Sequence, residues 1–356
     1  MEALIIPTFN CQLKCRHCFL PEALRKKSVL MEDSEYEFIL KKVQEMQDVV
    51  NDYGMLFIIS GGEPLTVGVK QMGFYLESIR KHFGKVPVNV NTNLLFYNQE
   101  FGRLFVEYDV EVEASYDPVG VRFVNHEMER EWERKFKNAL NDGVKIRVAI
   151  TLTRKVLTFD LFRFAEKLGT RHYNMSHFCP LGRGWKNRKE FYVTKKELAF
   201  YIMGVLHFQD LFEGLDIHPW KDFPENYHSG GAVDCWGECY NCFAFTPGGD
   251  VYFSGFCYSR HPLGNLYRDS LHEILFSEKR VSFIRWKLTR PECIQCEHHF
   301  FCRGGCFSLS KVVEDKTTCP GLKPLLDFLS MGRIPEELEG EFYRFIKNST
   351  WMGKYL

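Results

Sequence analysis

The stretch that decides the fold reads Thr8-Phe9-Asn10-Cys11-Gln12-Leu13-Lys14-Cys15-Arg16-His17-Cys18-Phe19. Its cysteines have the spacing C-x3-C-x2-C, and the apolar run Leu4-Ile5-Ile6 before them predicts a buried strand. Three thiolates on one short loop can bind one face of a metal centre, but they leave a four-ligand shell incomplete. The stretch therefore predicts a reactive metal site after the first strand. A structural zinc with a fourth ligand from elsewhere is the alternative.

The composition narrows the class of protein. A chain of 356 residues can bury a substantial core in one large domain or two smaller ones. Lys+Arg and Asp+Glu both number 46, so no basic field favours nucleic-acid binding. No apolar run approaches the roughly 18 residues of a membrane span, and no charged-then-apolar leader is present, so we expect a cytoplasmic protein. In such a protein, 13 cysteines indicate metal ligation rather than disulfides.

Between residues 2 and 206, short apolar runs alternate with amphipathic stretches, as in a parallel α/β sheet. One predicted helix, about 33–50, carries apolar side chains on one face, and another covers 194–206. Six such units predict an α/β fold built as a partial (β/α)6 TIM-like barrel, with reactive groups at the C-terminal ends of the strands. The predicted strands are 2–7, 55–60, 86–91, 109–115, 144–151 and 171–177.

Polar motifs follow these predicted strands. The second strand ends in Ser60-Gly61-Gly62-Glu63-Pro64, whose glycines expose backbone groups to a ligand and whose glutamate adds a carboxylate. The third ends in Asn91-Thr92-Asn93 and the fourth in Ser115-Tyr116-Asp117-Pro118. The sixth leads into Cys179-Pro180-Leu181-Gly182-Arg183-Gly184, where we interpret Cys179 as a buried cysteine, with a thiol that faces the reactive site as the alternative.

A second group of cysteines lies near the C-terminus. Five thiols between residues 293 and 319 are rare in a purely structural core, so they predict a further metal region, with a zinc ribbon as the alternative. The cysteines of this region are Cys235, Cys239, Cys242, Cys257, Cys293, Cys296, Cys302, Cys306 and Cys319.

The first loop, the GGEP run after strand two and the late cysteines resemble the radical S-adenosylmethionine (SAM) superfamily with a C-terminal SPASM extension. The resemblance implies a [4Fe-4S] cluster on Cys11, Cys15 and Cys18, with one iron left to chelate SAM. It further implies that the GGEP turn holds the amino group of SAM, and that Ser115 and an arginine hold its carboxylate. Arg130 is the preferred arginine and Arg122 the second candidate. The implied SAM-binding residues are Gly61, Gly62, Glu63, Pro64, Asn93, Ser115, Arg130 and Thr151.

The SPASM resemblance implies two auxiliary [4Fe-4S] clusters. One would take Cys293, Cys296, Cys302 and Cys319. The other would take Cys242, Cys257, Cys306 and one of Cys235 and Cys239. The sequence departs from the family near Gly249, because the expected cysteine five residues later is Ser254 and Cys257 follows three residues late. The implied domains are a radical SAM barrel (1–206), a bridge (207–232), a SPASM domain (233–319) and a helical tail (320–356).

Family members of this layout mature peptides or proteins. The leading hypothesis is therefore an oxidase that cleaves SAM to a 5′-deoxyadenosyl radical and modifies or crosslinks a peptide or protein side chain. Its implied partners are an electron donor, such as flavodoxin or ferredoxin, and a discrete peptide-recognition protein unless the peptide docks directly in the barrel. Asp117 and Tyr258 are the candidate general base or radical relay. Tyr258 replaces an aspartate of the sulfatase-maturing subclass, which disfavours that activity.

Two other functions stay open at the level of the sequence. A dehydrogenase or epimerase of a small molecule would need no peptide-recognition domain. A non-catalytic iron–sulfur scaffold or redox sensor would need no SAM site, and the presence of both the thiol loop and the GGEP run argues against it.

Overall fold

The protein is represented by a computed structural model that describes residues 1–20, 22–25, 29–212, 214–230, 241–253, 262–304 and 323–356. Its strands form one ten-stranded sheet in the order β10-β9-β8-β1-β2-β3-β4-β5-β6-β7. The bounds are β1 (Glu2–Thr8), β2 (Leu56–Gly61), β3 (Val88–Thr92), β4 (Val110–Tyr116), β5 (Lys145–Leu152), β6 (His172–His177), β7 (Asp216–His218), β8 (Cys242–Phe245), β9 (Asp250–Phe253) and β10 (Pro262–Asn265).

All six predicted strands are present, in sequence order and parallel. The sheet is longer than predicted, because β7 pairs with β6 and β8 pairs with β1, both in parallel. The hairpin β8–β9 and strand β10 then continue the sheet with antiparallel pairing. The curved sheet confirms the predicted partial barrel. Its strands continue through the predicted bridge (207–232) into the cysteine-rich region. The division into domains therefore stays a prediction.

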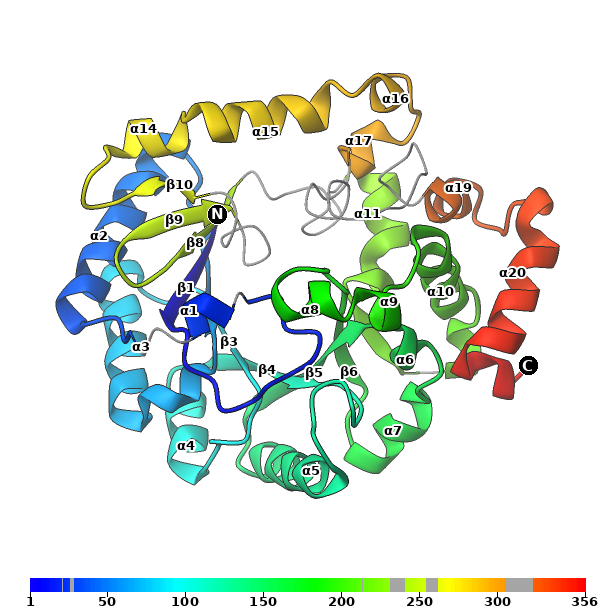
Figure 1. Cartoon of the computed structure of the whole chain (residues 1–356), viewed down its shortest axis with the longest axis horizontal. Coiled ribbons are helices and arrows are strands. Elements are labelled where there is room, and N and C mark those ends of the chain that lie inside the picture. The colour runs from blue at the N-terminus through cyan, green and yellow to red at the C-terminus, as the bar shows by residue number, and fades with distance from the viewer. Residues whose placement is uncertain (21, 26–28, 213, 231–240, 254–261, 305–322) are drawn as a thin grey trace.

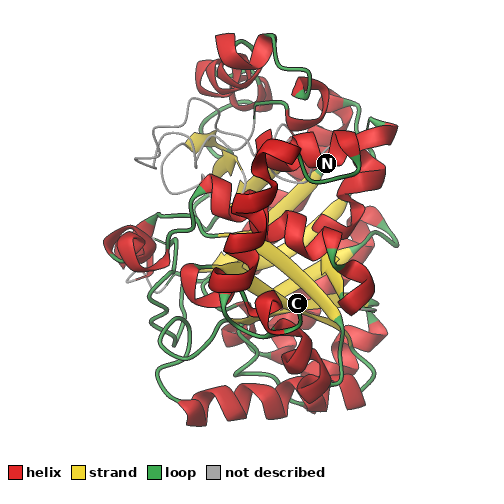
Figure 2. Ribbon diagram, turned by 90° about the vertical axis from the view of Figure 1, so that its right-hand side faces the viewer, coloured by secondary structure: helices red, strands yellow, loops and turns green. Residues whose placement is uncertain are grey.

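Helices cover the outer side of this barrel, as Figures 1 and 2 show. The barrel helices include α2 (Asp33–Val50), α3 (Val69–Phe83), α4 (Gln99–Glu107), α5 (His126–Asn141), α7 (Leu161–Leu168) and α10 (Lys195–His207). The predicted helix 33–50 is confirmed, and its buried side chains include Tyr36, Ile39, Leu40 and Val43, one face at helical spacing. The second predicted helix, 194–206, corresponds to α10, which begins with a capping box between Thr194 and Glu197.

The core lies between the sheet and its outer helices, and the inner side of the sheet is hollow. In β3, Val88 and Val90 are buried toward the helices, whereas the alternate residues Asn89 and Asn91 are only half-buried. Strand β5 repeats this pattern. Side chains alternate between the two faces of a strand, so the polar positions of both strands face the lumen. A closed TIM barrel fills this space with bulky apolar residues.

The C-terminal tail packs on the barrel wall. Helices α19 (Lys323–Met331) and α20 (Glu336–Ser349) both contact α10. The indole of Trp351 is buried and donates a hydrogen bond to the Tyr201 hydroxyl, with an N–O distance of 2.8 Å. The tail is helical, as predicted. None of the described helices combines the length and the apolar character that crossing a membrane requires.

We predict that Trp132→Ala destabilises the fold. Trp132 is fully buried on α5, where its ring lies 5.0 Å from that of Tyr116 and 5.2 Å from that of Phe136. Removing it leaves a large cavity, so the free energy of unfolding should fall by about 3–5 kcal/mol in anaerobic guanidinium titrations. The matched control is Trp185→Ala, at a partly exposed indole, with an expected loss below about 1 kcal/mol. Equal losses would contradict the packing described here.

Candidate functional site

The thiol loop is held by the turns that follow three different strands. The Glu63 and Gly62 amides, after β2, donate to the carbonyls of Asn10 (2.7 Å) and Thr8 (3.0 Å). After β4, the carbonyl of Val121 accepts from the Arg16 amide at 2.9 Å. After β6, the Gly184 amide donates to the carbonyl of Cys18 at 3.0 Å. The C-terminal ends of separate strands thus give the loop its shape.

Two glycines permit this close approach. A Cβ atom on Gly62 would overlap the carbonyl oxygens of Phe9 and Asn10. Gly182, in the turn after β6, has a φ of +53°, and a Cβ there would overlap the carbonyls of Phe19 and Leu20. Both glycine turns therefore contact the backbone of the cysteine loop directly, one on each side of it.

Cys11, Cys15 and Cys18 line a cavity of about 630 Å³ inside the barrel, within the usual size range of ligand sites. Most of the SAM-binding residues predicted from the sequence line the same cavity, namely Gly61, Gly62, Asn93, Ser115 and Thr151. Cys179 is buried and lines it too, together with His177, whose pKa is lowered to about 4 by burial, so that its imidazole is neutral near pH 7. The strand-end motifs do converge.

The structure does not bring three of the predicted SAM-binding residues to this cavity. Arg130 is exposed on α5 and is not among the cavity-lining residues, whereas the second candidate, Arg122, is. Pro64 is buried at the start of the 3-10 turn Pro64–Val67. Glu63 is fully buried too.

The Glu63 carboxylate binds the protein's own backbone. It accepts hydrogen bonds from the Leu65 amide (3.0 Å), the Asn93 amide (2.6 Å) and the Thr92 hydroxyl (2.5 Å). Burial raises the pKa of Glu63 to about 7, against the effect of these donors. In the structure this side chain ties the turn after β2 to the end of β3. The resemblance implies that the GGEP turn holds the amino group of SAM. In the structure, however, the Glu63 carboxylate does not line the cavity.

Asp117, a candidate base, lies in a buried charge network. Its carboxylate accepts from Arg122 Nε (2.9 Å) and the Thr151 amide (3.0 Å), and His17 Nε2 lies 3.2 Å away. Burial alone would raise the pKa of Asp117, but the charges of His17 and Arg122 hold it below its ordinary value. Arg122 Nη1 in turn lies 4.0 Å from the Cys15 sulfur. This geometry favours a role for Asp117 in positioning Arg122 and the thiol loop.

The donor set fits an iron–sulfur cluster. Burial raises the pKa of the Cys11 thiol, and that of Cys15 to about 12, so these groups ionise when a metal centre replaces their protons. Soft thiolates are the usual ligands of [4Fe-4S] clusters. Asn93 Nδ2 lies 3.8 Å from the Cys11 sulfur and can donate to it. Such contacts to ligand sulfurs tune the cluster.

The structure describes part of the second cysteine group. Cys242 begins β8 and lines the same cavity as the three loop thiols. Cys293 lies in α16 (Pro291–Ile294), Cys302 ends α17 (His299–Cys302), and the Cys296 amide between them donates to the Cys293 carbonyl at 3.1 Å. The remaining predicted residues of this region lie outside the described residues: Cys235, Cys239, Cys257, Tyr258, Cys306 and Cys319.

Comparison with solved structures identifies the fold. The chain superposes on native anSMEcpe with bound AdoMet (S-adenosylmethionine) with a TM-score of 0.74 at 20% identity, over 98% of this chain and 100% of that one. It also matches Streptococcus suis SuiB bound to precursor peptide SuiA, with a TM-score of 0.61 at 16% identity, over 90% and 73%. The chain has the radical SAM fold. Its C-x3-C-x2-C loop and late cysteines are the features that resemble radical SAM enzymes with a SPASM extension.

One curated protein is also similar to this chain in sequence. The antilisterial bacteriocin subtilosin biosynthesis protein AlbA of Bacillus subtilis (strain 168) is 25% identical over 325 residues, which is 84% of this chain. The match spans 65% of that protein's length. No family model matches the chain.

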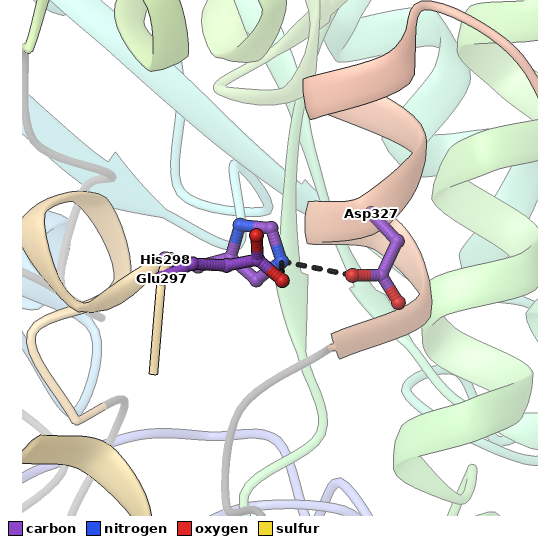
Figure 3. Close-up of side chains that lie close together, drawn as sticks. All are labelled: Glu297, His298 and Asp327. Atoms are coloured by element: carbon purple, nitrogen blue, oxygen red, sulfur yellow. Dashed lines mark hydrogen bonds and ion pairs between the residues drawn. The ribbon is translucent and has the colours of Figure 1, made fainter. Parts of the chain in front are cut away.

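The cysteine-rich segment is tied to one helix before it and one helix after it in the chain by a polar network that the sequence did not reveal. Figure 3 shows the contact between His298 and Asp327. His298, between Cys296 and Cys302, is buried; its Nδ1 lies 2.7 Å from the Tyr227 hydroxyl of α11 (Phe223–Ser229) and its Nε2 2.8 Å from Asp327 of α19. The ammonium of Lys323 pairs with the Asp327 carboxylate at 2.7 Å. Because both ring nitrogens are engaged, we interpret this cluster as a structural tether.

We predict that Gly62→Ala in this radical SAM barrel weakens retention of the N-terminal cluster. The added methyl group must displace the Phe9 and Asn10 carbonyls and hence the thiol loop. Iron retention against a chelator should fall about ten-fold, as expected when groups that support metal ligands are disturbed. The control Gly340→Ala, where a Cβ meets nothing within 4 Å, should retain iron like the wild type. Unchanged retention in Gly62→Ala would contradict the proposed role of this contact.

Proposed function

We propose that this protein is a radical SAM oxidase that modifies or crosslinks side chains of a ribosomally made peptide or of a protein. The observation that carries the proposal is the single cavity lined by Cys11, Cys15 and Cys18, by the Gly61–Gly62 turn, and by Cys242. A site for a reactive cofactor and a space for substrate are thereby combined inside one barrel. A scaffold or redox sensor would need no such cavity.

The roles of the chain's own residues follow from their positions. The three loop thiols would hold a [4Fe-4S] cluster, which supplies the electron that splits SAM into methionine and a 5′-deoxyadenosyl radical. The backbone at Gly61 and Gly62, with Asn93, Ser115 and Thr151, would bind SAM. Of the two arginine candidates for its carboxylate, we now favour Arg122, because it lines the cavity and Arg130 does not. The position of the site inside the barrel would limit the access of water to the reacting atoms.

The peptide substrate is supported by the kinds of protein that this chain resembles. AlbA is a biosynthesis protein of the bacteriocin subtilosin, and solved structures with this fold include anSMEcpe with AdoMet and the Cp18Cys peptide, and SuiB with its precursor peptide SuiA. An electron donor such as flavodoxin or ferredoxin, and a discrete peptide-recognition protein, belong to the same proposal. Which bond is formed in the substrate is left open.

Auxiliary clusters are the second part of the proposal. Cys242 faces the cavity, so a cluster bound there would lie beside the substrate and could accept its electron, which favours net oxidation. Cys293, Cys296 and Cys302, on one short segment anchored through His298, would provide three of the ligands of the other cluster. The missing ligands of both are the cysteines outside the described residues.

The test of the activity is anaerobic incubation with SAM and dithionite. We expect 5′-deoxyadenosine from the wild type and none from Cys15→Ala, because one loop ligand is lost. Cys302→Ala should still cleave SAM but lose turnover of a substrate peptide. Chromatography with mass detection measures both products. Equal loss of SAM cleavage in the two variants would reject this division of roles.

Metal content tests the number of clusters. Three [4Fe-4S] clusters require ~12 iron and ~12 sulfide per polypeptide after anaerobic reconstitution. Cys15→Ala should lose ~4 of each, if the cluster at the loop depends on that thiol. A wild-type value near ~4 would reject the auxiliary clusters, and zinc in place of iron would reject the proposed function itself.

A further inference from the structure

We propose that the outer surface of the thiol loop docks an acidic redox protein, which delivers single electrons to the cluster at this loop. This inference rests on the proposed function and specifies its electron donor. The docking surface combines the loop with α8 (Gly182–Lys186) and α9 (Arg188–Phe191). We call it the basic face and define it by Lys14, Arg16, Arg183, Lys186, Arg188 and Lys189.

Side-chain contacts join these segments into one continuous surface. Both terminal nitrogens of Arg16 donate to the Glu190 carboxylate of α9, at 2.9 and 2.5 Å. Asn187, between α8 and α9, donates from Nδ2 to the Arg16 carbonyl at 2.9 Å. Arg183 of α8 donates to the carboxylate of Glu22, just after the loop, at 3.0 Å. Residues 161 and 174 positions apart in the sequence are thereby brought together on the same face.

The basic face has an excess of positive charge, although the whole chain has 46 basic and 46 acidic residues. Two carboxylates lie among its cations, and each of them is shared by two basic side chains. The ion pairs are Arg16–Glu190, Lys155–Glu190, Arg183–Glu22 and Lys186–Glu22. Hydrogen bonds from Arg183 and Arg16 lower the pKa of Glu22 and of Glu190, so both carboxylates are ionised near pH 7. A positive charge is still left at each of the two places.

Exposed side chains add to this excess and supply an aromatic contact. Lys14 and Lys189 are both exposed. The Arg188 guanidinium lies 4.1 Å from the centre of the Trp185 ring, and this indole is 37% exposed. Tryptophan and arginine are enriched among the residues that anchor protein interfaces. The face therefore combines long-range attraction for a negative surface with a contact that acts at close range.

The thiol loop separates the basic face from the cavity. Cys15 is buried and lines the cavity, whereas its neighbours Lys14 and Arg16 are exposed and are not among the cavity-lining residues. Consecutive Cα atoms are about 3.8 Å apart, so a protein that contacts Lys14 and Arg16 lies one residue away from a ligand of the cluster. An electron donor has to approach the cluster closely without filling the space of the substrate. The basic face meets both requirements.

An acidic redox protein fits this face better than an acidic peptide does. One electron leaves the reduced donor for the cluster, and no bond is made or broken in this step. Attraction between opposite charges raises the rate at which two proteins meet without requiring a tight complex. Electron-transfer complexes are typically of this weak kind, with small interfaces. A peptide substrate has instead to reach the cavity, which the side chains of the basic face do not line.

The experiment gives the reconstituted full chain SAM and one of two reductants: dithionite, a small ion, or reduced flavodoxin, an acidic protein. The test variant is Lys186→Glu/Lys189→Glu, and its neutral counterpart is Lys186→Gln/Lys189→Gln. The matched control, Lys41→Glu/Lys137→Glu, reverses two exposed lysines on the outer helices α2 and α5. The rate of 5′-deoxyadenosine formation is the first readout. The affinity of each chain for oxidised flavodoxin, measured by calorimetry, is the second.

We expect the flavodoxin-dependent rate to fall about ten-fold in Lys186→Glu/Lys189→Glu and by less in the glutamine variant, because charge reversal replaces attraction by repulsion. The dithionite-dependent rate should equal that of the wild type in both variants. The affinity for flavodoxin should fall in parallel, and in the wild type it should weaken as ionic strength rises, since salt screens exposed charges. The Lys41→Glu/Lys137→Glu control should match the wild type with both reductants.

Three results would overturn the inference and leave the proposed function intact. One is an equal flavodoxin-dependent rate and affinity in the wild type and in Lys186→Glu/Lys189→Glu; binding of a decaglutamate peptide that this variant loses would then assign the face to an acidic peptide. Another is an equal loss of rate with both reductants, because the two lysines would then support the fold. The third is a wild type that uses dithionite but not flavodoxin. Absence of 5′-deoxyadenosine with both reductants would instead reject the proposed function.

Discussion

The site depends on the close contact between the thiol loop and the glycine turn after β2. The amides of Gly62 and Glu63 donate to the carbonyls of Thr8 and Asn10, and no side chain fits between the two backbones at Gly62. The turn after β6 approaches the loop from its other side at Gly182. Together the two contacts fix the backbone of the irregular segment that carries the three cysteines. Glu63 then links the same turn to the end of β3 through its buried carboxylate.

A network of charged side chains supports this backbone arrangement. Asp117 holds Arg122, and Arg122 extends to within 4.0 Å of the Cys15 sulfur. A buried cation beside a thiol favours its ionised form and so assists metal binding, although burial alone disfavours it. Residues that the sequence presented as separate motifs thus form one network, and the candidate base Asp117 is already occupied within it.

The open barrel gives the protein its large internal cavity. The polar residues of β3, β4 and β5 face inward, and strands β7 and β8 extend the sheet at its two ends without closing it. Consequently Cys242 on β8 and the loop thiols share one cavity, while β8 to β10 connect the barrel to the cysteine-rich segment. The tether from His298 to Tyr227 and Asp327 holds that segment against α11 and α19.

The sequence alone determined the order of the strands, the C-x3-C-x2-C loop and the clustering of the late cysteines, because alternation of apolar runs and ligand spacing are local properties of a chain. It could not decide between Arg122 and Arg130, since both follow the same strand and only the path of the loop before α5 brings Arg122 inward. Nor could it place β8 beside β1, or His298 between Tyr227 and Asp327, 71 and 29 residues away. Such contacts join distant parts of the chain, so only the packing of the tertiary structure decides them.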